Sequence, residues 1–125
     1  MNNKTQSAIQ TILVVEDEPA IRVMIETMLE DLPVAVTLVA TADEGFQALH
    51  SQTWRLIITD VQTPGRSNGI ELARAALAHL PVVQVIVMSG YHNAMGLPLP
   101  AGASFLSKPW SLEEFYELVK FHLST

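Results

Sequence analysis

Polar and charged side chains stand at the ends of four short apolar runs, and these residues are the ones best suited to chemistry. Short apolar runs are typical of buried parallel strands, and the carboxyl ends of such strands meet in one crevice. The pattern therefore predicts a site with three carboxylates, one hydroxyl and one ammonium group. The residues at these run ends are Glu16, Asp17, Asp60, Ser89 and Lys108.

The carboxylates of this crevice predict a magnesium site. Adjacent carboxylates repel one another, and one of them titrates at high pH unless a cation holds them together. Mg²⁺ prefers hard oxygen ligands in octahedral geometry and retains several waters. We expect Asp17 and Asp60 to ligate it, with Glu16 acting through water and the backbone carbonyl of Gln62 completing the protein ligands.

The other two groups indicate what the cation would serve. A carboxylate beside an ammonium and a hydroxyl is placed as a nucleophile for phosphoryl transfer. Mg²⁺ and Lys108 would neutralise the oxygens of the transferred group, and Ser89 would donate a hydrogen bond to one of them. Asp60 is the expected phosphoacceptor.

The elements that position these residues alternate between strand and helix patterns. This alternation predicts an α/β fold, a doubly wound five-stranded parallel sheet of the flavodoxin-like order 2-1-3-4-5 with helices on both faces. Gly96, Pro98 and Pro100 leave at most a short fourth helix, or none, between 90 and 102. The expected strands cover 11–15, 34–39, 54–60, 82–88 and 105–106.

Helix starts are marked by recognisable residues. Pro19 suits a first helical turn, with Asp17 or Glu18 available to cap it. Apolar residues then recur at helical spacing, and Met24 and Met28 are expected in the core. Two further starts are predicted as capping boxes, in which a hydroxyl and a glutamate three residues later cap one helix. These pairs are Thr41 with Glu44 and Ser111 with Glu114.

Composition bounds the class of protein. The chain has 125 residues, a net charge of −6 and no cysteine, which favours one globular domain, argues against a nucleic-acid surface and excludes disulfides. No apolar run approaches the roughly 18 residues needed to span a bilayer, so no membrane insertion is expected. Residues 1–10 are expected to be a flexible N-terminal lead-in and 11–123 the folded domain, located in the cytoplasm.

Taken together, these residues resemble the receiver domain of two-component response regulators. The resemblance covers about Thr11 to Leu123, and it implies a phosphoprotein whose acceptor aspartate takes a phosphoryl group from a sensor histidine kinase or a histidine phosphotransfer protein, with Mg²⁺ as cofactor. It implies no enzyme activity beyond self-phosphorylation and self-dephosphorylation. The residues that carry the resemblance are Glu16, Asp17, Asp60, Pro64, Gly69, Ser89, Lys108 and Pro109.

The resemblance also assigns finer roles. Ser89 and Phe105 would form the switch that follows phosphorylation, and Gln62 and Tyr91 would tune the phosphate lifetime. A cis peptide bond would precede Pro109. The signal and the downstream protein target are not named by the sequence.

Two features depart from the usual family pattern, and others point to a subtype. An apolar residue is usual where Thr63 stands, and the spacing from Pro64 to Gly69 is one longer than usual. The stretches at 64–69 and 88–91, with the shortened fourth helix, are closest in character to receivers of hybrid sensor kinases or stand-alone phosphorelay receivers.

Two alternative functions come from other classes. A receiver-like docking module that works without phosphorylation is motivated by the shortened segment 90–102, but the intact acidic set argues against it. A small Mg²⁺-dependent phosphatase would need a further acid–base group, and Gln62 stands where a second aspartate would be expected.

Overall fold

The chain folds around one five-stranded parallel sheet. The structure is a computed structural model, and it describes residues 9–90 and 99–125. The strand order is β2-β1-β3-β4-β5, and every pair is parallel, which confirms the predicted doubly wound α/β fold. The strands are β1 (Gln10–Val15), β2 (Val34–Val39), β3 (Leu56–Asp60), β4 (Gln84–Ser89) and β5 (Ala103–Ser107).

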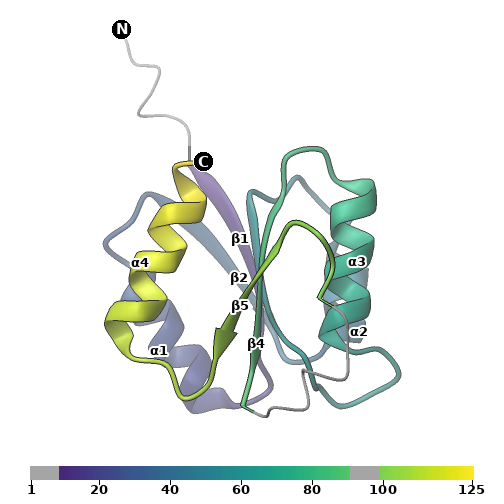
Figure 1. Cartoon of the computed structure of the whole chain (residues 1–125), viewed down its shortest axis with the longest axis horizontal. Coiled ribbons are helices and arrows are strands. Elements are labelled where there is room, and N and C mark those ends of the chain that lie inside the picture. Colours follow the sequence, from purple (N-terminus) through teal and green to yellow (C-terminus); the bar gives the residue numbers. More distant parts are fainter. Residues whose placement is uncertain (1–8, 91–98) are drawn as a thin grey trace, which may run out of the picture.

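Four helices cover the two faces of this sheet within the described residues. In Figure 1 the sheet is seen nearly edge-on, with α1 and α4 on one side and α2 and α3 on the other. The helices are α1 (Pro19–Leu29), α2 (Ala42–Ala48), α3 (Gly69–His79) and α4 (Leu112–Leu123).

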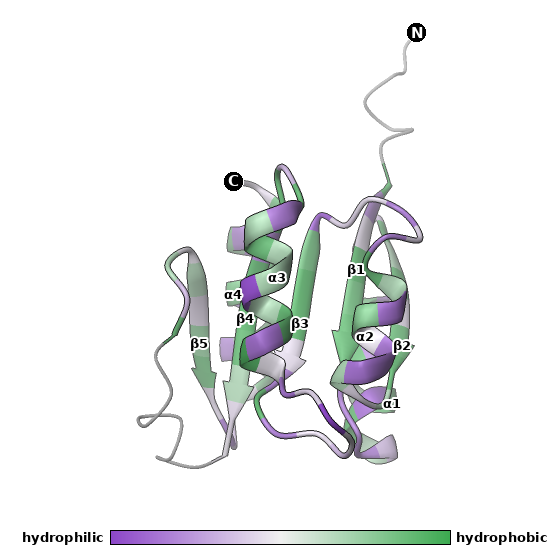
Figure 2. Ribbon diagram, turned by 90° about the vertical axis from the view of Figure 1, so that its right-hand side faces the viewer, coloured by the Kyte–Doolittle hydropathy of each residue, from purple (hydrophilic) through white to green (hydrophobic). Residues whose placement is uncertain are grey.

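The strands are apolar on both faces because helices cover both faces. Successive side chains of a strand point to opposite sides, so each strand supplies two separate cores. Ile12 and Val14 pack in the core beneath α1 and α4, and Leu13 and Val15 pack in the core beneath α2 and α3. Figure 2 shows the strands as green, apolar arrows whose heads end at the same edge of the sheet. That edge is therefore where polar strand ends gather.

Two of the four helix starts are capped as predicted from the sequence, and the other two are not. The capping boxes of Thr41 with Glu44 and of Ser111 with Glu114 are confirmed. A third box, Asn68 with Glu71, was not predicted from the sequence, and it starts α3 at Gly69.

The expected cap of α1 is wrong. Glu18 occupies the N-cap position, but its side chain makes no capping hydrogen bond. The main-chain N–H of Glu18 instead donates to Glu16 Oε2 at 3.0 Å. Pro19 at the start of the helix has no N–H that requires an acceptor. The side chains of Asp17 and Glu18 are exposed.

Part of the prediction falls on segments that the structure does not describe. The expected lead-in lies largely within 1–8, although Gln10 already belongs to β1, so the ordered sheet starts one residue earlier than expected. The described residues between β4 and β5, namely 90 and 99–102, contain no helix, and 91–98 lie outside the described part. Within the described ranges, no helix has the length and hydropathy to cross a membrane.

Candidate functional site

The predicted site residues meet at the carboxyl edge of the sheet. Glu16 follows β1, Asp60 ends β3, Ser89 ends β4 and Lys108 follows β5. The pairing of β3 with β4 and of β4 with β5 brings these strand ends together, since Asp60 pairs with Met88 and Ser89 with Ser107. All of these side chains line one open cleft of about 500 Å³, together with Asp17 and Gln62. The sequence-based prediction that they share one crevice is confirmed.

A single lysine joins the two buried carboxylates. Lys108 Nζ lies 2.8 Å from Glu16 Oε1 and 2.8 Å from Asp60 Oδ1. Glu16 is 1% exposed and Asp60 5% exposed, so both carboxylates have lost most of their contact with water. The second oxygen of Glu16 accepts the N–H of Glu18, which fixes the carboxylate at both ends. The resemblance assigned Lys108 to the phosphate, and in this structure Lys108 contacts the carboxylate of Asp60.

Burial and charge perturb the carboxyl of Asp60. Burial raises the pKa of Asp60 to about 7, the hydrogen bond from Lys108 opposes this rise, and the negative charge of Glu16 adds to it. For Lys108, burial lowers the pKa, but the hydrogen bonds to Asp60 and Glu16 outweigh that effect and the net shift is upward. A positive ammonium therefore faces a carboxyl that ionises reluctantly, and any added cation would favour the ionised form.

The donor set fits a magnesium ion. Glu16, Asp17 and Asp60 each offer a carboxylate oxygen, and the three oxygens lie within 4.8 Å of one another. Asp17 is exposed while the other two are buried, so one side of the cluster is open to solvent. Mg²⁺ is usually held by one or two carboxylates with several retained waters, which this half-open arrangement accommodates.

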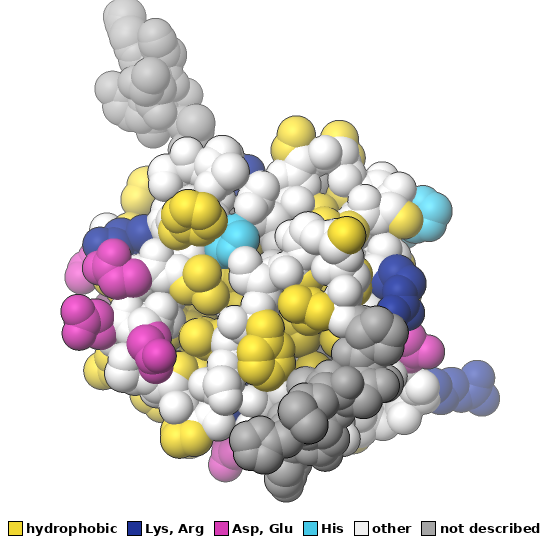
Figure 3. Space-filling view, in the orientation of Figure 1, with side chains coloured by type: hydrophobic (Ala, Val, Ile, Leu, Met, Phe, Trp, Pro, Cys, Tyr) yellow, Lys and Arg dark blue, Asp and Glu magenta, His cyan; other side chains and the backbone are white. Residues whose placement is uncertain are grey.

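The remaining predicted residues lie at or near the cleft. Ser89 is 7% exposed and lines it, as does the exposed residue Gln62. Tyr91 lies outside the described residues. Phe105 is 42% exposed on β5, so it is not a core residue. Figure 3 shows apolar side chains exposed near the middle of the face that β5 and α4 present.

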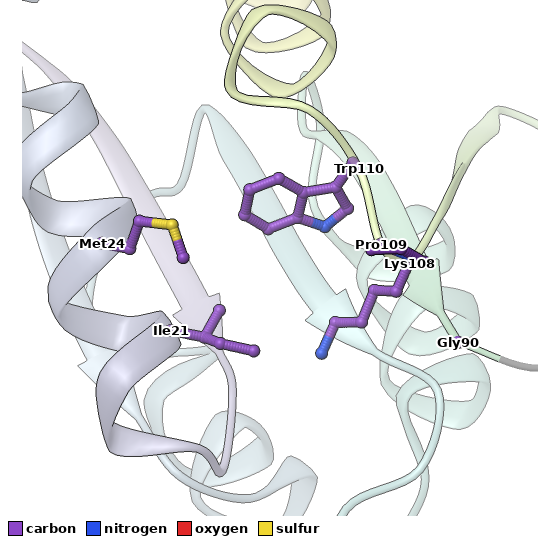
Figure 4. A pocket seen from close by; sticks show the side chains of 6 residues that line it. All are labelled: Ile21, Met24, Gly90, Lys108, Pro109 and Trp110. Atoms are coloured by element: carbon purple, nitrogen blue, oxygen red, sulfur yellow. The ribbon is translucent and has the colours of Figure 1, made fainter.

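An apolar pocket adjoins the cleft. Figure 4 shows Ile21 and Met24 of α1 facing Trp110 across this pocket, with Lys108 at its rim. The volume of the pocket is about 360 Å³. Met24 is 39% exposed, so our expectation that it is a core residue is wrong; Met28 packs against the core as expected. The ring of Trp110 stacks on Phe115 at 4.6 Å between centroids. Its buried Nε1 has no hydrogen-bond partner in the described part of the chain.

Two residues outside the acidic cluster, His122 and Asp43, make polar contacts that were not predicted from the sequence. His122, on the buried side of α4, contacts Ser104 Oγ through Nε2 at 2.8 Å and Gln84 Oε1 through Nδ1 at 2.6 Å. Asp43, on α2, accepts hydrogen bonds from the loop that follows β3. No spacing along the chain indicates the contacts of His122. The only signal for the contacts of Asp43 is that the spacing from Pro64 to Gly69 is one residue longer than usual.

Comparisons with known proteins agree with this geometry. The chain is 30% identical over 112 residues to the transcriptional regulatory protein DltR of Streptococcus agalactiae, a match covering 87% of this chain and 50% of DltR. It is 31% identical over 118 residues to the regulatory protein VirG of Agrobacterium tumefaciens, covering 90% and 43%. The chain thus spans about half the length of these curated relatives.

A solved structure gives the same result. The receiver domain of sensor histidine kinase PA1611 from Pseudomonas aeruginosa PAO1, crystallised with a magnesium ion coordinated in its active-site cleft, superimposes with a TM-score of 0.78. It is 25% identical and covers 94% of this chain and 100% of that one. The peptide bond between Lys108 and Pro109 is cis, as the resemblance implied. The family model of the response regulator receiver domain matches residues 12–120, and the chain belongs to that family.

Proposed function

We propose that this receiver domain is a phosphoacceptor switch in which Asp60 takes a phosphoryl group from a phosphohistidine in a Mg²⁺-dependent reaction. The observation that carries the proposal is the placement of Asp60, which is buried, bonded to Lys108 and within reach of the carboxylates of Glu16 and Asp17. A carboxylate held between an ammonium and a cation-binding cluster is the arrangement that an aspartyl phosphate requires.

The proposed transfer is an exchange of one bond for another. The P–N bond of the phosphohistidine breaks as a P–O bond forms to Asp60. The leaving imidazole carries a proton on its other ring nitrogen, so it leaves as a neutral imidazole. When bound, Mg²⁺ supplies positive charge to the phosphoryl oxygens. Lys108, which is ion-paired with Glu16, supplies a second positive charge. Ser89 supplies a hydrogen-bond donor at the end of β4. The protein's part is positioning and charge stabilisation.

The response to phosphorylation is proposed to run through β4 and β5. The phosphoryl group adds a charge of about −1.5 to −2. Ser89 would move toward it, and the side chain of Phe105, exposed in this structure, would turn inward. Two such positions of one aromatic side chain form a bistable element that phosphorylation can bias. Changed contacts with a downstream protein would then follow at the face formed by β5 and α4.

The proposed donor is a protein, either a sensor histidine kinase or a histidine phosphotransfer protein. The apolar pocket between α1 and Trp110 lies at the rim of the acidic cleft. A protein that presents a phosphohistidine to Asp60 would cover this pocket, and burial of apolar surface would contribute to its affinity. We propose no turnover of an external substrate: self-phosphorylation and self-dephosphorylation are the only reactions assigned to this chain.

The test is intact mass spectrometry after incubation with a small acyl phosphate. The expected result is an adduct of one phosphoryl group on the wild-type chain in the presence of Mg²⁺, none after chelation, and none on the variant Asp60→Asn. Glu117→Gln, which alters an exposed carboxylate of α4 outside the cleft, serves as a labelling control and should still take the adduct. Equal labelling of the Asp60 variant, or labelling that ignores Mg²⁺, would contradict the assignment.

A further inference from the structure

The loop that connects β3 to α3 is fixed at both of its ends. The N–H of Val61 donates to the carbonyl of Met88 at 2.8 Å, and the N–H of Gly69 donates to the carbonyl of Val61 at 2.7 Å. Gly69 passes so close to the backbone of Asp60 that a Cβ at this position would collide with the Asp60 carbonyl oxygen. The loop therefore starts and ends against the residue that carries the acceptor carboxyl.

The tip of the same loop is held by α2. Asp43 Oδ2 accepts the N–H of Arg66 at 2.9 Å, and Asp43 Oδ1 accepts the N–H of Ser67 at 3.0 Å. These contacts, led by the Arg66 N–H, lower the pKa of Asp43. Gly65 has φ of 106°, and a Cβ there would also collide with the Asp43 carboxylate. Conformation and space both select glycine at this turn.

A second contact holds the loop nearer to the cleft. Thr63 Oγ1 accepts the N–H of Ala42, in the first turn of α2, at 2.9 Å. The hydroxyl can donate in turn to the carbonyl of Ser67, at a longer 3.4 Å. Gln62 consequently lies between two anchored residues, Val61 and Thr63, and its backbone carbonyl has little freedom to turn. Both departures from the family pattern, Thr63 and the longer loop, belong to this connection with α2.

We propose that Asp43 is a positioning residue for the cation site. By clamping the loop tip, together with the Thr63 contact, it holds Gln62 at the cleft that this residue lines, so that α2 sets how tightly the cleft binds a divalent cation. The inference rests on the proposed function and on the expectation from the sequence that the backbone carbonyl of Gln62 is a ligand. Asp43 itself lies outside the set of residues that line the acidic cleft.

The test compares two variants that remove the same charge from the same helix turn. Asp43→Ala removes the clamp. Glu44→Ala is the matched control, because Glu44 Oε1 also accepts two main-chain N–H groups, at 2.7 and 3.2 Å, yet it caps α2 and touches no residue of the loop. Mg²⁺ affinity of each unphosphorylated protein is measured by calorimetry, and amide hydrogen exchange is measured without metal. Gly65→Ala supplies a second, charge-neutral way to disturb the clamp.

We expect Asp43→Ala to weaken Mg²⁺ binding by about 3- to 10-fold, the range for coupling through a structural connection. Exchange of the Arg66 and Ser67 amides should accelerate by about 10-fold without metal. Glu44→Ala should change neither quantity by as much as twofold, and Gly65→Ala should resemble Asp43→Ala. If the wild type binds Mg²⁺ and Asp43→Ala binds it with the same affinity, the positioning role of Asp43 is overturned and the proposed function is not. No Mg²⁺ binding by the wild type overturns the proposed function as well.

Discussion

Replacing Asp60 with asparagine should make the metal-free protein more stable at alkaline pH. The raised pKa of Asp60 means that the folded state retains a proton that the unfolded chain has released between pH 3.8 and about 7. Stability therefore falls as pH rises through this window, and the full penalty is present above about pH 7. Asparagine has nearly the same shape and no charge, so the variant does not carry the penalty.

The size of the effect follows from the shift. Each pKa unit corresponds to about 1.4 kcal/mol, so a rise from 3.8 to about 7 sets an upper value of about 4 kcal/mol at pH 8. The attraction of Lys108, which lowers the pKa of Asp60, is already contained in this net shift. We expect a gain of about 3–4 kcal/mol at pH 8 and about 1–2 kcal/mol at pH 5, where most of the wild type's Asp60 is protonated.

Urea unfolding followed by circular dichroism, at pH 5 and pH 8 in chelator, measures both values. Addition of 10 mM MgCl₂ should reduce the gain at pH 8, because the ion binds and stabilises the wild type and not the variant. Asp17→Asn is the matched control: it removes a carboxylate of the same cluster that is exposed, and it should shift stability much less. A variant at position 60 that is no more stable than the wild type at pH 8 would refute the reasoning.

Two further predictions concern Lys108 and His122. Lys108→Ala leaves two buried carboxylates without their ammonium partner, so it should cost about 3–5 kcal/mol of stability at pH 8, measured by urea unfolding. It should also raise the pH at which Mg²⁺ binding is half-maximal, measured by calorimetry. Tighter Mg²⁺ binding at low pH would contradict this. Burial and then the charge of Arg55 lower the pKa of His122, so in the Asp60→Asn background stability should fall as pH drops below 6.5. His122→Gln should remove that fall, and an unchanged pH profile would argue against it.

The sequence determined the features that depend on neighbouring residues. Apolar runs with polar ends located every strand to within about two residues, because burial on both faces selects such runs wherever they occur. Two capping boxes were read correctly, since their hydrogen bonds join residues three apart. The Asn68 box was missed because its surroundings, rich in glycine and serine, are equally typical of a loop. The chemistry of the site followed from which residue types stand at the strand ends.

The tertiary structure decided what depends on residues far apart in the chain. Lys108 and Glu16 are separated by 92 positions, and only the assembly of the five strands into one sheet places the ammonium between Glu16 and Asp60. The pKa of Asp60 depends on this assembly, because burial, which contributes most to the shift, is a property of the packed fold. The clamp between Asp43 and the loop after β3 joins residues 23 and 24 apart, and no local pattern specifies it. Local patterns fix elements and chemical types, whereas packing fixes the distances and the dielectric surroundings on which reactivity depends.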